Sequence, residues 1–276
     1  MSAPQALANV RALKVNGAGN AFYLIDDRPP LPLDRARLAA LACAQPGSLA
    51  ADGVLFVQPP PPGGAAVATM RIFNADGSEA QTCGNGLRCV ARYLWERDGR
   101  GRAFSIATAA GLVAAVVEPG PPFRARVDMG EPQIVERLQA GATIAAAGTT
   151  WRYAQVWTGN PHAVVFVDDV AGVDLDRAGA AIARDARFPE GANVHFTAVA
   201  GPHALTVLHY ERGVGPTQAC GSGAVAAAVA AIDCGAVSSP VTVRVPGGEL
   251  TVAWKPGESA TLEGPAEFEF ERELSL

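Results

Sequence analysis

The segment Thr82-Cys83-Gly84-Asn85-Gly86-Leu87-Arg88-Cys89 lies between a strand-like run, Val67–Phe73, and a helix-like run that continues to Leu94. The thiol of Cys83 therefore stands where a helix is expected to begin. Backbone N–H groups and the positive end of the helix dipole stabilise a thiolate at such a position. Because glycine carries no Cβ, the two glycines after Cys83 allow a ligand to approach N–H groups that can hold a carboxylate or phosphate. The segment predicts a reactive thiol beside an anion-binding turn.

The same pattern occurs a second time at an offset of 137 residues. The segment Thr217-Gln218-Ala219-Cys220-Gly221-Ser222-Gly223 follows a strand-like run, Leu205–Tyr210, and precedes a helix-like run, Ala224–Ile232. Three more correspondences keep the same order along the chain: Phe73-Asn74 with Tyr210-Glu211, Gly19-Asn20 with Gly159-Asn160, and Gly53–Phe56 with Asn193–Phe196. The chain is therefore predicted to contain a duplication of a large unit, far longer than a solenoid repeat.

Short strands dominate the pattern of both halves, and each half has one minor helix besides its glycine-headed helix. In the first half, Asp34 is expected to cap a helix that runs to about Ala44, with Leu38 and Leu41 on its buried face. In the second half, Asp176–Arg184 is expected to be helical. Because the helices do not alternate one-for-one with the strands, a Rossmann sheet is disfavoured and an α+β fold is predicted.

The composition argues against several classes of function. The chain has 276 residues and a net charge of −5 without a basic stripe, so nucleic acid is not an expected partner. No apolar run approaches the roughly 20 residues of a membrane-spanning helix, and Met1–Lys14 lacks the layout of a signal peptide. No membrane partner is expected, and the expected location is cytoplasmic, where thiols stay reduced.

The cysteine and histidine spacings do not predict a metal site. Five cysteines occur without a Cys-x-x-Cys pair, and four histidines occur without a spacing typical of metal ligands. Apart from the matched pair, the cysteines are expected to pack in the core, and three histidines are expected to be structural or solvated. These residues are Cys43, Cys89, Cys234, His195, His203 and His209.

A matched pair of cysteines suits a two-base isomerase. Moving the α-hydrogen of an amino acid to the opposite face requires one thiolate to remove the proton and one thiol to return a proton. The developing carbanion requires a polarised carboxylate, which two helix N-termini can hold without pyridoxal phosphate. The residues predict a cofactor-free racemase or epimerase whose partner is a small-molecule amino-acid substrate.

The motifs also resemble those of the diaminopimelate epimerase family. The matching blocks are Phe73–Ala80 with Cys83–Cys89, Gly159–His162, Tyr210–Gly215, Ala219–Gly223, Gly17–Phe22 and Ala51–Gly53. The resemblance implies two pseudo-symmetric halves, each a mixed β-barrel-like sheet around a central helix, with the site in the cleft between them. We place these halves at 1–128 plus 263–276, which carries Cys83, and at 129–262, which carries Cys220.

The activity that the resemblance implies is epimerisation of LL-2,6-diaminopimelate to the meso isomer, for lysine and peptidoglycan biosynthesis. In this reaction Cys83 and Cys220 are the two bases, and His162 and Glu211 help to orient the reacting centre. The resemblance implies no cofactor and no metal, and a homodimer is expected by analogy. The implied substrate-binding residues are Asn20, Asn74, Gly84, Asn85, Asn160, Asn193, Glu211, Arg212, Gly221 and Ser222.

Departures from the family pattern leave the substrate open. Asn16 stands where the family often has histidine, Ala21 where aspartate usually follows Asn20, Pro216 in place of an acidic residue, and Ser48-Leu49-Ala50 in place of a glycine-rich turn. A related isomerase of the same fold, proline- or histidine-racemase-like, is therefore an alternative. Two other classes are a thiol redox protein, in which oxidation would join Cys83 and Cys220 in a disulfide, and a non-catalytic amino-acid-binding module. The binding module would tolerate loss of either cysteine.

Overall fold

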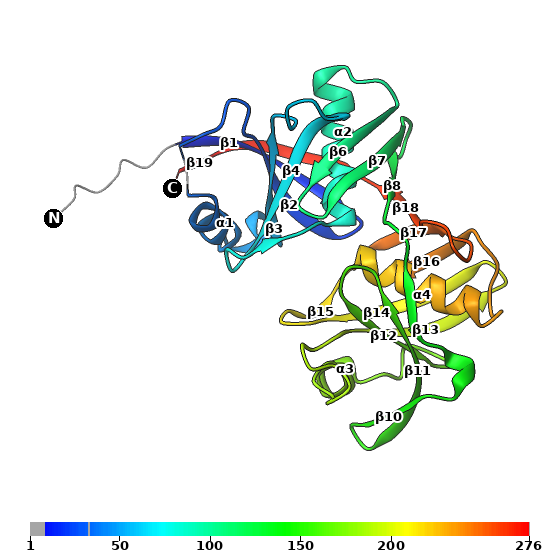
Figure 1. Ribbon diagram of the computed structural model, residues 1–276. Coiled ribbons are helices and arrows are strands. Elements are labelled where there is room, and N and C mark those ends of the chain that lie inside the picture. The colour runs from blue at the N-terminus through cyan, green and yellow to red at the C-terminus, as the bar shows by residue number, and fades with distance from the viewer. Residues whose placement is uncertain (1–8, 33, 276) are drawn as a thin grey trace. The chain divides into compact units, whose positions relative to one another are not determined.

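The computed structural model describes residues 9–32 and 34–275, and this part of the chain divides into two compact units (Figure 1). One unit lies within Met1–Ala125 and Pro265–Leu276, and the other is Arg126–Gly264. The division expected from the sequence differs from these bounds by two or three residues at each junction.

The first unit is a mixed sheet packed around one long helix, α2 (Gly84–Asp98). Its second helix, α1 (Arg35–Cys43), contacts β3 and β4, and a short turn of 3-10 helix, η1 (Gly47–Leu49), follows it. The strands that lie wholly in this unit are β1 (Asn9–Gly17), β2 (Asn20–Asp26), β3 (Gly53–Gln58), β4 (Ala66–Asn74), β5 (Glu79–Ala80), β6 (Ala103–Thr108), β7 (Gly111–Glu118) and β19 (Glu267–Ser275). Strand β8 (Arg124–Asp128) begins in this unit and ends in the second.

Helix α1 begins where the sequence predicts. Its N-cap is Asp34, whose Oδ1 accepts the Arg37 N–H at 3.0 Å. Leu38 is buried as expected, but the prediction for Leu41 was wrong, because 43% of that residue is exposed. At 100° per residue the buried face is centred between Leu38 and Ala39, and Leu41 lies well to the other side of the helix.

The second unit is likewise a mixed sheet packed around one central helix, α4 (Gly221–Asp233). Its minor helix, α3 (Leu175–Ala183), is capped by Asp174, and η2 (Leu138–Ala140) is a 3-10 turn. The strands are β9 (Gln133–Glu136), β10 (Thr143–Ala146), β11 (Thr149–Trp157), β12 (Pro161–Phe166), β13 (Asn193–Gly201), β14 (Ala204–Glu211), β15 (Gly215–Thr217), β16 (Val241–Val245), β17 (Gly248–Ala253) and β18 (Thr261–Pro265).

Three successive strand pairings recur in the two units, which confirms the predicted pseudo-symmetry. In the first unit β2 and β3 pair in parallel, β3 and β4 are antiparallel, and β4 and β6 are parallel. In the second unit β12 and β13, β13 and β14, and β14 and β16 repeat this parallel, antiparallel, parallel series. Each unit therefore has the mixed sheet and central helix expected of an α+β duplication.

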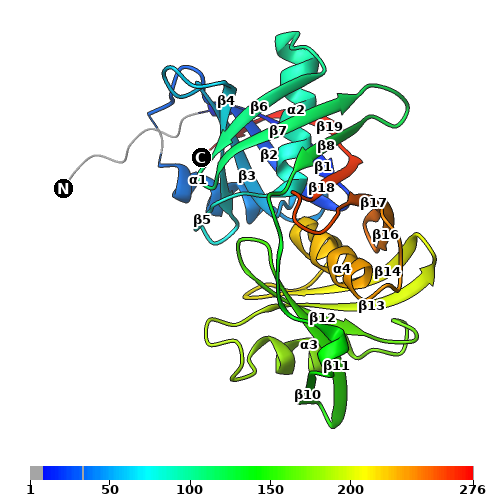
Figure 2. The same cartoon turned by 45° about the vertical axis from the view of Figure 1, so that its right-hand side comes forward.

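The central helices are buried to different depths. Helix α4 is buried along nearly its whole length, and its stretch Ala224–Ala231 exposes 2% or less of every residue. It contacts β11, β12, β13 and β14, and small alanine side chains allow this close approach of the surrounding strands (Figure 2). Helix α2 also buries its first two turns but ends in solvent at Gly99, which adopts a left-handed φ of 63° as the C-cap.

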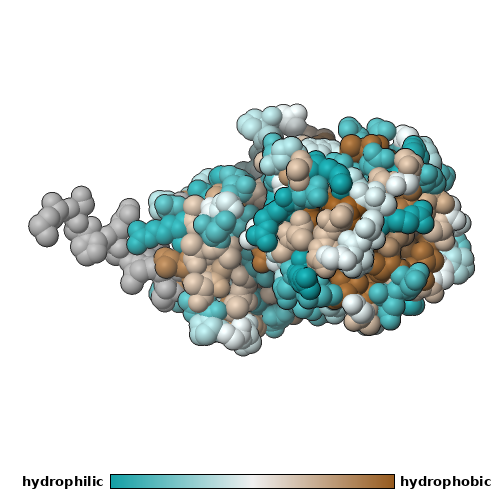
Figure 3. Space-filling view, turned by 90° about the horizontal axis from the view of Figure 1, so that it is seen from below, coloured by the Kyte–Doolittle hydropathy of each residue, from teal (hydrophilic) through white to brown (hydrophobic). Residues whose placement is uncertain are grey.

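The surface view shows hydrophobic and hydrophilic side chains interspersed over one face of the molecule (Figure 3). Large hydrophobic residues with substantial exposure are Leu41, Leu112, Val135, Trp157, Val199 and Val214. Within residues 9–32 and 34–275, no helix has both the length and the apolar character needed to cross a bilayer.

Candidate active site

Cys83 is the N-cap of α2. Its backbone is extended, with φ −152° and ψ 113°, and its carbonyl accepts the Leu87 N–H at 2.8 Å, which starts the helix. Its Sγ lies 3.4 Å from the Gly86 nitrogen and accepts that N–H. A peptide N–H and the helix dipole therefore both act on the sulfur, and both favour its anionic form.

Cys220 repeats this geometry at the start of α4. Its φ and ψ are −127° and 111°, and its Sγ accepts the Gly223 N–H at 3.4 Å. The Ser222 hydroxyl lies 3.5 Å from the same sulfur. Cys220 is 6% exposed, whereas Cys83 is partly exposed, so the two equivalent thiols differ in their access to solvent.

Gly86 and Gly223, in the first turns of α2 and α4, are closely packed against neighbouring strands. A Cβ on Gly86 would lie 2.7 Å from Leu55 Cδ2, and a Cβ on Gly223 would lie 2.3 Å from His195 Cε1. Real Cβ atoms do not approach other heavy atoms so closely, so something must move if either glycine gains a side chain. Beside Gly86 the Leu55 methyl group can shift, whereas beside Gly223 the His195 ring is held at both of its nitrogens.

Two predicted site residues of the first unit are in contact although 65 residues separate them. The side chain of Asn85 donates from Nδ2 to Asn20 Oδ1 and accepts from Arg88 Nη1 at 2.9 Å through its own Oδ1. Asn85 is 1% exposed. Its side chain thus joins β2 to the helix, and binding of substrate through the backbone N–H of Asn85 stays a prediction.

Asn74 lies at the exposed end of β4. Its side chain donates to Ser78 Oγ at 3.0 Å, and its backbone N–H donates to the Ser78 carbonyl at 2.8 Å. The amide is thus engaged in the turn between β4 and β5, and binding of substrate by Asn74 stays a prediction.

His162 belongs to a buried chain of three histidines. Its Nδ1 lies 2.7 Å from His195 Nε2, and His195 Nδ1 lies 2.8 Å from His209 Nδ1. Its Nε2 lies 2.7 Å from Asn160 Oδ1 and 2.8 Å from Thr158 Oγ1. The structure thus joins the predicted site residues Asn160 and His162. His195 and His209 extend this hydrogen-bonded chain, whereas the sequence predicts only that they are structural or solvated.

Burial keeps these imidazoles neutral. It lowers the pKa of His162 to about 3, helped by the charges of His209 and Arg212, and it lowers the pKa of His209 to about 3. The pKa of His195 lies well below its usual value for the same reason, with smaller contributions from the other two histidines.

A single arrangement of protons satisfies this neutral chain. Asn160 Oδ1 can only accept, so His162 donates from Nε2 and accepts at Nδ1 from His195, which in turn accepts at its Nδ1 from His209. The last nitrogen, His209 Nε2, is buried and has no hydrogen-bond partner among the described residues. Asn160 therefore sets the tautomer of His162, which presents an N–H to the Asn160 side.

The register of one strand pair explains why the sequence motifs do not reveal His195 and His209. Strands β13 and β14 are antiparallel, and His195 lies directly opposite His209. Pairing the strand-like run Leu205–Tyr210 with the segment that precedes it, through the short turn at 202–203, could have shown this contact, because residues opposite each other in a hairpin share a face.

We expect the histidine chain to make the fold acid-sensitive. Because the folded pKa of His162 and His209 is lowered to about 3, the unfolded state binds more protons between pH 3 and pH 6.5, so stability rises with pH across this window. Between pH 7.5 and 5.5 each buried histidine should cost about 1.4 kcal/mol of unfolding free energy. Urea denaturation at both pH values measures this loss.

Two substitutions make this pH test specific. His209→Leu should reduce the loss between the two pH values by about 1.4 kcal/mol. His203→Gln should leave the loss unchanged, because the His203 side chain is exposed and its one hydrogen bond among the described residues is with the Ser238 carbonyl. An equal loss in the wild type and in His209→Leu would contradict the assignment of neutral buried histidines.

The residues predicted to bind the charged ends of a substrate lie near the end of β14. Glu211 Oε1 accepts the Thr217 hydroxyl at 2.6 Å, and Asn193 Oδ1 accepts the Arg212 backbone N–H at 3.0 Å. Asn193 thus fixes the backbone that carries Arg212. The guanidinium of Arg212 is exposed and donates to the Glu190 carbonyl at 2.7 Å.

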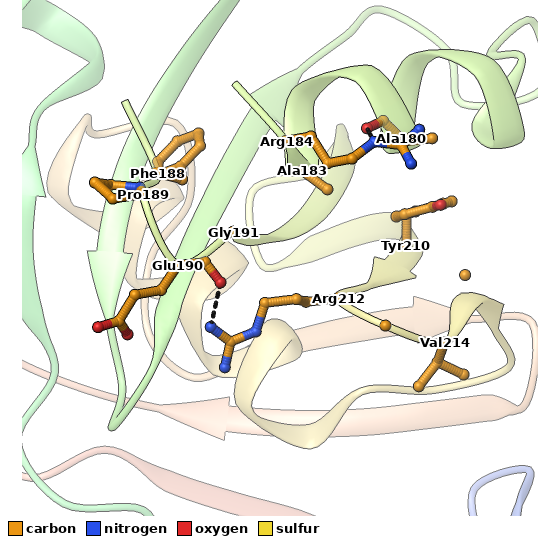
Figure 4. A pocket seen from close by; sticks show the side chains of 12 residues that line it. Ala180, Ala183, Arg184, Phe188, Pro189, Glu190, Gly191, Tyr210, Arg212 and Val214 are labelled. Carbon is orange, nitrogen blue, oxygen red and sulfur yellow. Dashed lines mark hydrogen bonds between the residues drawn. The ribbon is translucent and has the colours of Figure 1, made fainter. Parts of the chain in front are cut away.

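The Arg212 side chain forms part of the wall of an open cavity of about 610 Å³ (Figure 4). The walls come from α3, from the loop that carries Phe188 and Glu190, and from the turn after Tyr210. Figure 4 shows the guanidinium directed at the Glu190 carbonyl, so a planar cation lies at the edge of a space large enough for a small ligand. No group of His, Cys, Asp and Glu in the described residues is arranged to hold a metal ion.

The architecture defines a class of proteins built from two such halves. It matches a phenazine biosynthesis protein of the PhzF family from Bacillus anthracis, with a TM-score of 0.75 and 16% identity over 98% of this chain and 100% of the other. It also matches a hydroxyproline epimerase from Agrobacterium vitis, with a TM-score of 0.71 and 19% identity over 98% and 92% of the two chains. At these identities the likeness shows the fold alone.

Sequence comparison places the chain within this class. The family model for diaminopimelate epimerase matches residues 12–135 and 155–269. A diaminopimelate epimerase of Xanthomonas euvesicatoria is 40% identical over 99% of both chains, and one of Methanothermobacter thermautotrophicus is 39% identical over 87% of this chain and 88% of its own. The chain belongs to the diaminopimelate epimerase family.

Proposed function

We propose that this protein interconverts LL- and meso-2,6-diaminopimelate, with Cys83 and Cys220 as its two acid–base groups and without a cofactor. One observation carries the proposal: equivalent helices of the two units are each capped by a cysteine whose sulfur accepts a peptide N–H. A buried structural cysteine has no need of this geometry. Family membership supplies the substrate class.

The reaction exchanges one proton for another at the α-carbon. One thiolate takes the α-proton and becomes a thiol, and the C–H electron pair moves into the carboxylate as a carbanion with enediolate character. The second thiol then donates its proton to the opposite face and becomes the thiolate. No oxidant or reductant is consumed, and the charge has moved from one cysteine to the other at the end of each turnover.

The carbanion is stabilised at the carboxylate. The first-turn N–H groups of α2 at Gly84 and Asn85 and of α4 at Gly221 and Ser222 carry the positive ends of two helix dipoles, which suit a carboxylate that gains charge in the transition state. For these groups to act together, both turns must engage the carboxylate of one substrate molecule, and water that would compete for the carbanion must be excluded from it.

The remaining polar residues suit a substrate charged at both ends. Glu211 can take an ammonium group, and Arg212 can pair with a carboxylate through two parallel N–H bonds. Asn160 is partly exposed and can bind a polar group of the substrate. His162 is 0% exposed and both of its ring nitrogens are engaged, so it acts by holding Asn160 in place without adding charge. The amides of Asn20 and Asn74 suit either end, although each would have to exchange or share a present hydrogen bond to bind the substrate.

One departure from the family pattern has a structural role. Asn16 Oδ1 accepts the Gly19 N–H at 2.8 Å, and its Nδ2 donates to Glu269 Oε1 at 3.2 Å. Its side chain thus holds the turn between β1 and β2, just before Asn20.

Proton NMR of the purified protein with LL-diaminopimelate in D₂O, without added cofactor, tests the proposal. The α-proton signal should disappear as the meso isomer forms. If the reduced, folded protein shows neither exchange nor isomerisation, diaminopimelate is not its substrate.

The same assay separates the alternatives. Exchange of proline or histidine but not of diaminopimelate would favour a racemase of the related kind. Binding without exchange would favour an amino-acid-binding module. A redox protein would be favoured if mild oxidation protected both thiols from alkylation and the reduced protein showed no isomerase activity. A cytoplasmic location and a homodimer stay predictions from the sequence.

A further inference from the structure

Arg88 is a fully buried cation without a carboxylate partner in the described structure. It lies in the second turn of α2 and is 0% exposed. It donates to three neutral oxygens: from Nη1 to Asn85 Oδ1 at 2.9 Å and to the Gly84 carbonyl at 3.3 Å, and from Nε to the Pro265 carbonyl at 3.3 Å. Its Nη2 has no hydrogen-bond partner among the described residues. A buried charge in this situation is costly unless an anion lies nearby.

The guanidinium is directed back toward the helix N-terminus that Cys83 caps. Both Gly84 and Asn85 belong to the first turn, and long helical side chains point in that direction. Burial lowers the pKa of Arg88 to about 10, and the strongest opposing effects are attraction to Cys89 and Cys83. The two sulfurs are therefore the groups able to supply the missing negative charge.

Cys89 is unsuited to supply it. Cys89 is 0% exposed, and burial raises the pKa of its thiol to about 12 despite the nearby charges of Arg88 and Arg92. Other charged groups around this part of the helix are Arg124, which repels Arg88, and Glu269, which acts against ionisation of Cys89. Cys83 is partly exposed and accepts a peptide N–H, so it can carry the charge at lower cost.

The second unit lacks an equivalent cation at the matching position. The offset of 137 residues that relates Cys83 to Cys220 places Val225 where the first unit has Arg88, and Val225 is 1% exposed. The side chain packed against the first turn of α4 is His195, a neutral imidazole. Two helices that are equivalent in backbone geometry thus differ in the charge placed behind their first turn.

We propose that Arg88 holds Cys83 as the resting thiolate, while Cys220 rests as the thiol. Arg88 is a positioning residue for charge and does not touch the reacting atoms. The assignment of charge stands on the structure alone, and its catalytic meaning rests on the proposed function. The free protein is ready to remove a proton with Cys83. After each turnover that begins in this way the negative charge is on Cys220, and it must return to Cys83 before the next.

Alkylation across a range of pH tests this assignment without using any substrate. The folded protein is treated with iodoacetamide between pH 5 and pH 10, and the modification rate of each cysteine is followed by peptide mass spectrometry. The midpoint of each rate profile reports ionisation, whereas the plateau reports access, so the lower exposure of Cys220 does not confuse the comparison. The midpoint of Cys83 should lie about one pH unit or more below that of Cys220.

Variants of two arginines on the same helix assign the effect to Arg88. Arg88→Met should raise the Cys83 midpoint by about one pH unit, and Arg88→Lys should keep most of the effect if the methionine variant does not fold. Arg97→Met is the matched control, because Arg97 is exposed in the last turn of α2 and pairs with Glu271. It should leave the Cys83 midpoint unchanged.

Three outcomes would overturn the proposal: a Cys220 midpoint at or below that of Cys83, an unchanged Cys83 midpoint in folded Arg88→Met, or an equal shift in Arg97→Met. Because iodoacetamide reports the thiols directly, a low Cys83 midpoint in a protein that does not isomerise diaminopimelate would overturn the proposed substrate and leave the charge assignment standing.

Discussion

The single substitutions Cys83→Ala and Cys220→Ala should each lower kcat for diaminopimelate epimerisation by about 10³-fold or more. Acid–base groups commonly contribute about 10²- to 10⁴-fold, and a two-base reaction cannot complete the inversion with one of its two groups missing. Neither side chain fills a large part of the core, so we expect both variants to fold. Coupled measurement of meso-diaminopimelate formation gives the rate, and circular dichroism verifies the fold.

The other cysteines provide the control for this experiment. Cys234 lies at the end of α4, where its thiol donates to the Ala231 carbonyl at 3.4 Å, far along the helix from Cys220. Cys234→Ala should keep kcat within about twofold, since substitutions away from special contacts have small effects. Retention of more than about a tenth of the activity in either Cys83→Ala or Cys220→Ala would contradict the two-base assignment.

Gly223→Ala should lower both stability and activity. The new Cβ would lie 2.3 Å from His195 Cε1. The imidazole cannot swing aside freely, because both of its nitrogens are held by hydrogen bonds of 2.7 and 2.8 Å to His162 and His209. The clash is therefore relieved by moving the first turn of α4, at a cost of about 1–3 kcal/mol.

This displacement should also reach the chemistry. The Gly223 N–H is the donor to Cys220 Sγ, so a shifted first turn misplaces both the sulfur and its stabilising N–H. Because a displacement of about 1 Å can reduce a rate by about 10²-fold, we expect kcat to fall by about that factor. Urea denaturation and the epimerase assay measure the two effects.

Gly172→Ala is the matched control for this substitution. No heavy atom of a neighbouring residue lies within 4 Å of the point that a Cβ on Gly172 would occupy, and its φ is not left-handed, so an added methyl group meets nothing there. The substitution should change the unfolding free energy by less than about 0.5 kcal/mol and leave kcat unaltered. A Gly223→Ala variant that behaves like Gly172→Ala would show that the contact with His195 does not constrain the α4 turn.

Local signals in the sequence were sufficient for the backbone of the site. The repeated Cys-Gly-x-Gly pattern predicted two capped helices, and both sulfurs accept the N–H three residues on. The strand-like run Val67–Phe73 lies within β4, which pairs with β3 in antiparallel orientation. These features depend on residues close together in the chain, where glycine freedom, capping and strand alternation act over a few bonds.

Side-chain contacts across the fold were beyond that reasoning. A periodic pattern shows which face of a strand or helix is buried, but it does not show what lies opposite. The contact of Asn20 with Asn85 depends on the packing of α2 against β2, and the pair of His195 with His209 depends on the register of β13 and β14. Each joins residues that find each other only after the strands have paired.

The sequence by itself determined that the chain is a duplicated α+β protein of the diaminopimelate epimerase family, with a cysteine at the head of each central helix. Only the tertiary structure decided how these two equivalent turns differ. Behind Cys83 it buries Arg88 among neutral oxygens, and beside the Cys220 turn it packs the neutral His195. The reason is physical: the cost of a charge depends on burial and on the groups around it in space, and neither is encoded by neighbours in the chain.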